Sequence, residues 1–288
     1  MDLQIRSRVG EYQFSSRLAR SSDRDNIARL CRRAVGRNDY VLHMLDEILG
    51  KRRLFVVFSR NGELIGMSSF TPVFDRSGWL GMARTDPDWR GKGVAQFLQR
   101  TIASHAKKKG IRKLRFFVLS TNTSSLRAAT KGGFKSVAHA SHVTFNLKSS
   151  RSLRNISGIK LEPGRISMHQ MLNSGYVSKM NGYLRYGYVF VRAQRHTLQY
   201  TARKKELFCY GNSSFILKKT DEKHAEFSIL TGSVRDTLLK ILKIALEMKA
   251  ESVSGFVPYD HYMIRLCRSL GFVQDSWGKH SIVFEKSI

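Results

Sequence analysis

Two stretches of the chain repeat one alternation of apolar strands and apolar-striped helices. In the first, residues 79–85 and 113–119 are patterned as strands, and residues 96–109 and 125–131 as helices. In the second, residues 225–230 and 252–257 are patterned as strands, and residues 234–248 and 259–269 as helices. Apolar residues three and four positions apart indicate half-buried helices. The order predicts an α/β fold with a mixed parallel and antiparallel sheet (α+β), in two similar halves.

Further strands are expected on either side of these stretches. Residues 12–19, 54–59 and 64–71 have strand character, and Asn61-Gly62 predicts a tight hairpin turn between the last two. Residues 135–137 and 143–147 are expected as two closing strands of the first half. Residues 207–210, 215–217 and 282–285 are expected as strands of the second half.

The turn between the strand at 79–85 and the long helix contains two glycines. It reads Asp-Pro-Asp-Trp-Arg-Gly-Lys-Gly-Val-Ala over residues 86–95. Gly91 and Gly93 have no Cβ, so a ligand can approach the backbone closely. The first N–H groups of the following helix have no partner within the helix. These features predict an anion site, for which phosphate is the usual occupant.

The sequence of this turn resembles the R/Q-x-x-G-x-G/A loop of the GNAT acetyltransferase superfamily. Asn122 and Gly133-Phe134 follow it at the distances typical of that family. The resemblance implies an acyl-CoA N-acyltransferase fold that binds acetyl-CoA as co-substrate, with the pyrophosphate in the loop. The strand before the loop would splay from its neighbour and pair with the pantetheine arm. The implied cofactor contacts are Ala83, Arg84, Thr85, Arg90, Gly91, Lys92, Gly93, Val94, Ala95, Asn122 and Ser125. For Asn122, capping of the next helix is the alternative role.

The second half repeats the order of elements but not the loop. Its turn at residues 231–236 reads Thr-Gly-Ser-Val-Arg-Asp, with a single glycine. It therefore resembles a degenerate GNAT domain, and the layout of two tandem copies is similar to that of histidine-type N-acetyltransferases. We expect a GNAT domain with the acetyl-CoA site over residues 1–148, a linker and leading segment over 149–185, and the degenerate domain over 186–288.

The resemblance implies direct attack by an amine acceptor, which would be a small molecule, an amino acid or a protein amine bound between the two halves. The positions at which the family often has a catalytic base fall on Gly81, Met82 and Phe117. The family's frequent proton-donating tyrosine falls on Ala129. The acid and base are therefore unassigned. Asp86 and Asp75 are the nearest carboxylates, with loop capping as their alternative role.

The charge of the chain suggests a second class of function. The 288 residues carry a net charge of +28, divided as +17 over residues 1–150 and +11 over the rest. Such a field attracts polyanions. The alternative function is therefore a non-catalytic or weakly active GNAT-fold protein that binds nucleic acid or the ribosome through its basic surface. A general bias toward basic proteins explains the charge equally well. Residues 107–109 with Arg112 and Lys113 are a candidate basic patch.

Several classes of protein are not expected. Cys31, Cys209 and Cys267 are far apart and form no CxxC, which argues against a disulfide framework or a zinc site. The histidines have no ligand-like grouping, so no metal is expected. No apolar run approaches the ~20 residues of a membrane span, and the first residues lack the layout of a signal peptide. We expect a cytoplasmic monomer or homodimer without membrane contact.

Overall fold

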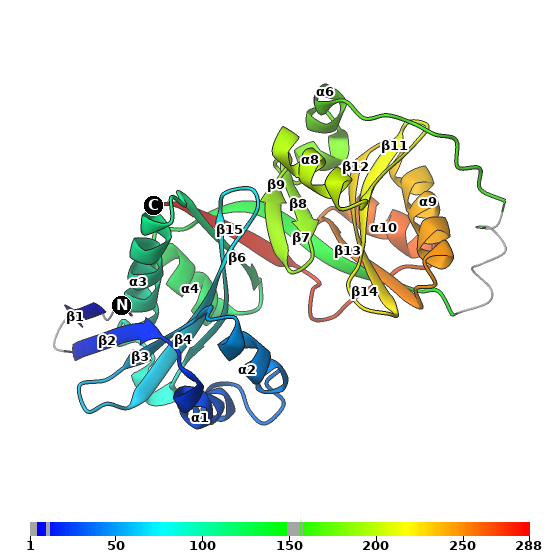
Figure 1. Ribbon diagram of the computed structural model, residues 1–288. Helices are drawn as coiled ribbons and strands as arrows, with labels where there is room; N and C mark the ends of the chain where they lie inside the picture. Colours follow the sequence, from blue (N-terminus) through cyan, green and yellow to red (C-terminus); the bar gives the residue numbers. More distant parts are fainter. Residues whose placement is uncertain (1–4, 10–11, 149–155, 157) are drawn as a thin grey trace. The chain divides into compact units, whose positions relative to one another are not determined.

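The computed structural model describes residues 5–9, 12–148, 156 and 158–288 (Figure 1). The chain divides into two compact units. The first contains the described residues up to Phe116 together with Ser124–Lys135 and Glu285–Ile288. The second contains Phe117–Thr123 and Ser136–Phe284. The chain thus contributes separate segments to each unit, and the predicted domain limits at residues 148 and 185 remain predictions.

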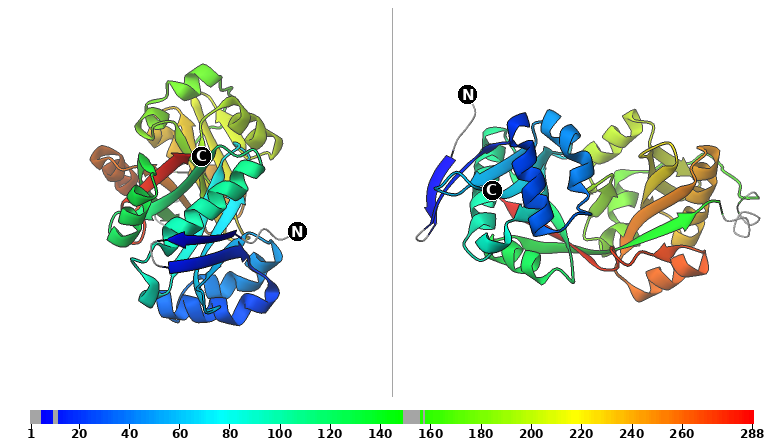
Figure 2. Two further views of the ribbon diagram at one scale, coloured as in Figure 1. Left: turned by 90° about the vertical axis from the view of Figure 1, so that its left-hand side faces the viewer. Right: turned by 90° about the horizontal axis from the view of Figure 1, so that it is seen from below.

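Antiparallel strands form most of the sheet of the first unit. β1 (Ile5–Val9) and β2 (Tyr12–Leu18) form a hairpin (Figure 2), followed by β3 (Leu54–Phe58), β4 (Leu64–Pro72) and β5 (Gly78–Thr85). β5 then pairs in parallel with β6 (Lys113–Leu119), whose last three residues belong to the second unit. The helical segments are η1 (Ser21–Asp23), α1 (Arg24–Ala34), α2 (Val41–Gly50), η2 (Pro87–Trp89), α3 (Val94–Lys108) and α4 (Thr123–Lys131).

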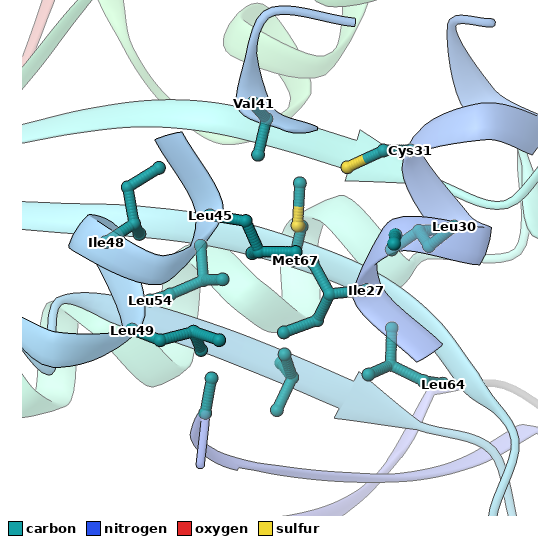
Figure 3. Packing of buried hydrophobic residues seen from close by; sticks show 13 residues of the cluster. Ile27, Leu30, Cys31, Val41, Leu45, Ile48, Leu49, Leu54, Leu64 and Met67 are labelled. Atoms are coloured by element: carbon teal, nitrogen blue, oxygen red, sulfur yellow. The ribbon is translucent and has the colours of Figure 1, made fainter. Parts of the chain in front are cut away.

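Helices cover both faces of this sheet because its strands are apolar on both sides. α1 and α2 bury their apolar stripes against one face, where Ile27, Leu45 and Met67 are at most 2% exposed (Figure 3). α3 packs on the opposite face, since a Cβ added to Gly66, the neighbour of Met67, would lie 2.6 Å from Val94. The start of α3 is therefore anchored directly on the sheet.

The part of the sheet that lies in the second unit is also mixed. Its order is β7 (Lys135–Asn146), β13 (Ser252–Pro258), β12 (His224–Thr231), β11 (Ser213–Lys219) and β10 (Leu207–Tyr210), and only β12 and β13 are parallel. β8 (Tyr183–Tyr186) and β9 (Val189–Arg192) form a separate hairpin. The remaining elements are α6 (Met168–Leu172), α7 (Gly175–Lys179), α8 (Arg195–Arg203), α9 (Val234–Glu247), α10 (His261–Ser269), β14 (Val273–Gln274) and β15 (Ser281–Ser287). The last three residues of β15 belong to the first unit.

The predicted repeat is present, with one correction. The order β5–α3–β6–α4 recurs as β12–α9–β13–α10, and each copy contains a parallel pair of strands. The two closing strands expected at 135–137 and 143–147 are instead one strand, β7, which begins at Lys135 and ends at Asn146. The residues between the two apolar runs are partly polar, so the sequence indicated a break there. In the structure this stretch is still part of the strand, because Ala140–His142 pair with β13.

Candidate cofactor site

The backbone of the glycine turn is shaped by its sequence. Asp86 caps the short helix η2 by accepting a hydrogen bond from the N–H of Asp88 at 3.0 Å. Gly91 and Gly93 then have φ values of 78° and 85°. This left-handed conformation is readily adopted by glycine and strained for most other residues. Two glycines therefore turn the chain from η2 into α3.

The turn presents a row of backbone donors. Among the described residues, the N–H groups of residues 91–96 donate to no acceptor, and the first α3 bond of this region is from Phe97 to the carbonyl of Gly93. α3 is 15 residues long, so its N-terminus carries a partial positive charge. A Cβ added to Gly91 would meet no atom within 4 Å. Open space and unpaired donors fit a pyrophosphate group.

Two basic side chains are fixed at the turn. Arg90 donates from Nη2 to the carbonyl of Ala34 at 2.9 Å. The ammonium of Lys92 lies 5.0 Å from the ring centre of Trp89 and 5.4 Å from that of Tyr12. These contacts leave the charge of Lys92 unneutralised, so it adds to the attraction for anions.

β5 leaves part of one edge without a strand partner. Its pairing with β6 ends at Trp79 opposite Arg115, while its pairing with β4 continues to Thr85. Between these points, Met82 has a φ of 53° in a register shift of the β4–β5 ladder. Among the described residues, β5 and β6 therefore pair at two positions only, and the expected splay beyond them remains a prediction because Phe117–Leu119 belong to the second unit. The backbone of residues 83–85 is suited to pair with the amides of an extended ligand.

The side chain of Arg84 has a structural partner that the sequence did not suggest. It forms two hydrogen bonds with the carboxylate of Asp39, whose side chain is fully buried. Burial alone would raise the pKa of Asp39, but the hydrogen bonds from Arg84 and the charge of this guanidinium outweigh it and hold the pKa below its usual value. Any cofactor contact of Arg84 is therefore assigned to its backbone.

Two expected contacts follow β6. Asn122 belongs to the second unit, whereas Ser125 lies in the first unit within the first turn of α4. Their roles toward the cofactor remain predictions. The Gly132-Gly133 stop of α4 is present, with a φ of 75° at Gly133.

Asp86 and Asp75 are both engaged in ion pairs. Asp86 is 2% exposed and accepts two hydrogen bonds from Arg33, at 2.6 and 3.1 Å, which lower the pKa of its carboxyl group. Asp75 accepts hydrogen bonds from Ser77 and from the buried Arg115. These contacts favour structural roles for both carboxylates, and the general base remains unassigned.

The equivalent turn of the second unit is filled and acidic. A Cβ on Gly232 would lie 2.8 Å from the Cα of Ser213 and 2.9 Å from the Oγ1 of Thr237. In the first turn of α9, Asp236 accepts hydrogen bonds from Ser213 and Lys240. Among the described residues, the N–H groups of residues 232–236 also lack acceptors, but the turn has no open space at its glycine and carries a carboxylate in its first helical turn, which repels phosphate.

Other kinds of site are not indicated in the described part of the chain. No cluster of three or more His, Cys, Asp or Glu side chains suited to a metal ion occurs among these residues. None of the described helices combines the length and apolar character needed to cross a membrane.

Comparison with known proteins agrees with the geometry of the first unit. Residues 25–134 match the model of the Acetyltransferase (GNAT) family. This match covers η2, the glycine turn and α3, and it supports the predicted resemblance. No curated protein sequence matches the chain.

Solved structures resemble almost the whole chain in fold. A GCN5-related N-acetyltransferase from Sphaerobacter thermophilus is 14% identical, with a TM-score of 0.56, and the match covers 95% of each chain. A protein classed as an acetyltransferase from Thermoplasma acidophilum is 16% identical, with a TM-score of 0.56, over 92% of this chain and 89% of the other. A glucosamine N-acetyltransferase region of a fungal multi-domain enzyme is 12% identical, with a TM-score of 0.59, over 96% of this chain and 38% of the other.

Proposed function

Since residues 25–134 match the model of the Acetyltransferase (GNAT) family, we propose that this protein transfers an acetyl group from acetyl-CoA to an amine by direct attack. The enzyme class, N-acetyltransferase, is that of the family. The acceptor is a small molecule, an amino acid or a protein amine. One observation carries the proposal: at the start of a long helix, the six consecutive N–H groups of residues 91–96 have no acceptor within the described part of the chain.

The first unit supplies the groups that hold the co-substrate. The N–H groups of the turn bind the pyrophosphate, and Arg90 and Lys92 add positive charge. The open edge of β5 at residues 83–85 pairs with the pantetheine amides. Acetyl-CoA, when bound, supplies an activated thioester.

The absence of an assigned base is compatible with activity. A lysine-like amine of pKa ~10.4 costs about 4.6 kcal/mol to deprotonate at pH 7. Holding two reactants in line supplies roughly 7–11 kcal/mol. Positioning is the larger contribution, so the chain can accelerate transfer without a dedicated carboxylate.

The direct test is thiol release from acetyl-CoA in the presence of amines, amino acids, peptides and aminoacyl-tRNAs. At least one class should release thiol above the rate of hydrolysis, with a matching acetylated product by mass spectrometry. Bound acetyl-CoA without release for any acceptor class would contradict transferase activity.

The exposed basic surface supports a second candidate, binding of RNA or DNA with weak catalysis or none. Lys107, Lys108, Lys109 and Arg112 are exposed at the end of α3. Lys113 is instead paired with Glu285 at 2.8 Å. The candidate patch therefore presents four cations.

A further inference from the structure

The second unit contains a buried arginine in which two guanidinium nitrogens have no acceptor among the described residues. Arg185 of β8 is 6% exposed, and its Nε and Nη1 atoms have no hydrogen-bond partner among the described residues. The rings of Phe117, Phe190 and Phe256 surround it, with centres 5.7, 5.4 and 4.8 Å from the guanidinium carbon. Ring faces attract a cation but cannot accept its hydrogen bonds in the plane of the guanidinium. Such a group calls for an explanation, because burying a cation without acceptors is costly.

A carboxylate with one oxygen that receives no hydrogen bond from the described residues lies in the electrostatic range of this arginine. Glu226 of β12 has a buried Oε2 atom that, within the described residues, receives no hydrogen bond. Burial raises the pKa of Glu226, although the charges of Arg185 and Lys218 oppose this effect. Burial likewise lowers the pKa of Arg185 to about 10, which leaves it charged at neutral pH. The two groups interact through space without forming an ion pair.

The sheet around this pair has one polar face. Successive residues of a strand point to opposite faces, and the core face of β12 and β13 carries Ala225, Phe227, Val253 and Val257, each at most 1% exposed. The other face carries polar residues that lie opposite one another on neighbouring strands. The cross-strand pairs on this face are Glu226–Ser254, Ser254–Thr144 and Phe256–His142.

Most polar groups of this face are satisfied by one another. The two ring nitrogens of His224 contact the hydroxyl groups of Ser252 and Ser254 at 2.8 and 2.9 Å. Asp275 accepts hydrogen bonds from Thr144 and His142. Arg185 and Glu226 differ from these residues, because each has hydrogen-bonding atoms without a partner among the described residues. The two side chains have opposite charges and interact electrostatically.

We propose that this face of the second unit is a binding site for a small molecule that carries both a carboxylate and an amine, such as a free amino acid. The carboxylate accepts a charge-assisted hydrogen bond from one of the two unpartnered nitrogens of Arg185, Nε or Nη1, which lie on different edges of the guanidinium plane. The ammonium donates to Glu226, and the rings of Phe117, Phe190 and Phe256 contact the apolar part. Binding of the amino acid here does not require acetyl-CoA in the first unit.

The test measures binding by calorimetry and thermal unfolding of the full chain. The probes are the standard amino acids, with simple carboxylates lacking the amine and simple amines lacking the carboxylate. At least one amino acid should raise the midpoint of unfolding, and the single-function probes should not. Arg185→Met and Glu226→Gln should each weaken binding about ten-fold or more, since each removes a charged hydrogen-bond partner.

Arg192→Met is the matched control on the same hairpin. The guanidinium of Arg192 already donates to the carbonyl of Asn181 at 3.0 Å and stacks over Tyr183, so its loss should leave the amino acid affinity unchanged. If Arg185→Met does not fold, the amino acid affinities of Glu226→Gln and Arg185→Lys test the site instead, because both substitutions nearly keep the volume of the side chain.

Two results would overturn the site: no amino acid binds, or binding survives in both Arg185→Met and Glu226→Gln. Conversion of the bound amino acid, measured by mass spectrometry with acetyl-CoA present, would identify it as the acceptor. Binding without conversion would identify it as an effector, and either result supports the site. Absence of thiol release with intact amino acid binding would contradict the proposed transferase function alone.

Discussion

Arg84 and Asp39 form a two-pronged ion pair that joins the strand before the glycine turn to the start of α2. The Nε and Nη2 atoms of Arg84 lie 2.7 and 2.6 Å from the two carboxylate oxygens of Asp39. Asp39 also accepts a hydrogen bond from the N–H of Val41. The pair thus fixes the backbone of β5 where it approaches the proposed pantetheine edge.

Asp39→Asn should lower the free energy of unfolding by about 3 kcal/mol, since it leaves a largely buried guanidinium without its counter-charge. Urea denaturation of the full chain measures this. The matched control is Asp46→Asn, because the pair of Asp46 with Arg24 is exposed to solvent, and it should leave the free energy nearly unchanged. Equal effects of the two substitutions would contradict a special role for the buried pair.

The same carboxylate should make stability sensitive to acid. The pKa of Asp39 is lower in the folded protein than its ordinary value of 3.8. Its contribution is therefore present above that value and is lost as the pH falls through the folded pKa. Between about pH 4 and 2, wild type should lose stability more steeply than Asp39→Asn. If the free energy of unfolding depended on pH in the same way for wild type and Asp39→Asn, the pKa of Asp39 would be the same in the folded and unfolded states.

Gly93→Asp should abolish acetyl-CoA binding while the protein remains folded, because the side chain blocks approach to the backbone and its charge repels pyrophosphate. Gly110→Asp is the matched control: Gly110 has a similar φ of 72° at the other end of α3, with no atom near its Cβ position. Calorimetric titration compares the two. An unchanged affinity of Gly93→Asp for acetyl-CoA would show that the cofactor does not bind at the glycine turn.

Acetyl-CoA should bind with about one equivalent per chain, through the first unit. The reason is the contrast between the open turn at Gly91 and the filled turn at Gly232, where Asp236 adds negative charge. Calorimetry on the full chain gives the stoichiometry, and a value near two would contradict the contrast.

Replacement of Lys107, Lys108 and Lys109 by glutamine should reduce RNA affinity if the basic surface has a polyanionic partner. The salt dependence should also flatten, because fewer counterions are released on binding. Turnover of small amines should not change, since these residues lie at the end of α3 opposite the glycine turn. If wild type binds no RNA near 50 mM salt, a condition at which phosphate contacts are strong, the patch has no such partner.

The pattern of the sequence alone determined most elements and the place of the glycine turn. Period-two and period-3.6 alternation located β5, α3, β12 and α9 to within a few residues, because burial on one side is recorded along each element. The glycines of the turn were recognisable because their backbone conformation excludes most other residues. The superfamily resemblance and the fold class drawn from these features are confirmed by the family match over residues 25–134 and by the solved structures.

Only the tertiary structure decided which distant charges meet. Asp39 and Arg84 are 45 positions apart, and Arg115 and Glu285 are 170 apart, at 2.6 Å between Nε and Oε2. Nothing in local spacing indicates such pairs, because they depend on side-chain directions after the sheets have packed. The same holds for Arg185, which reads as one more basic residue in the sequence. Its missing acceptors become evident only when folding encloses it among aromatic rings.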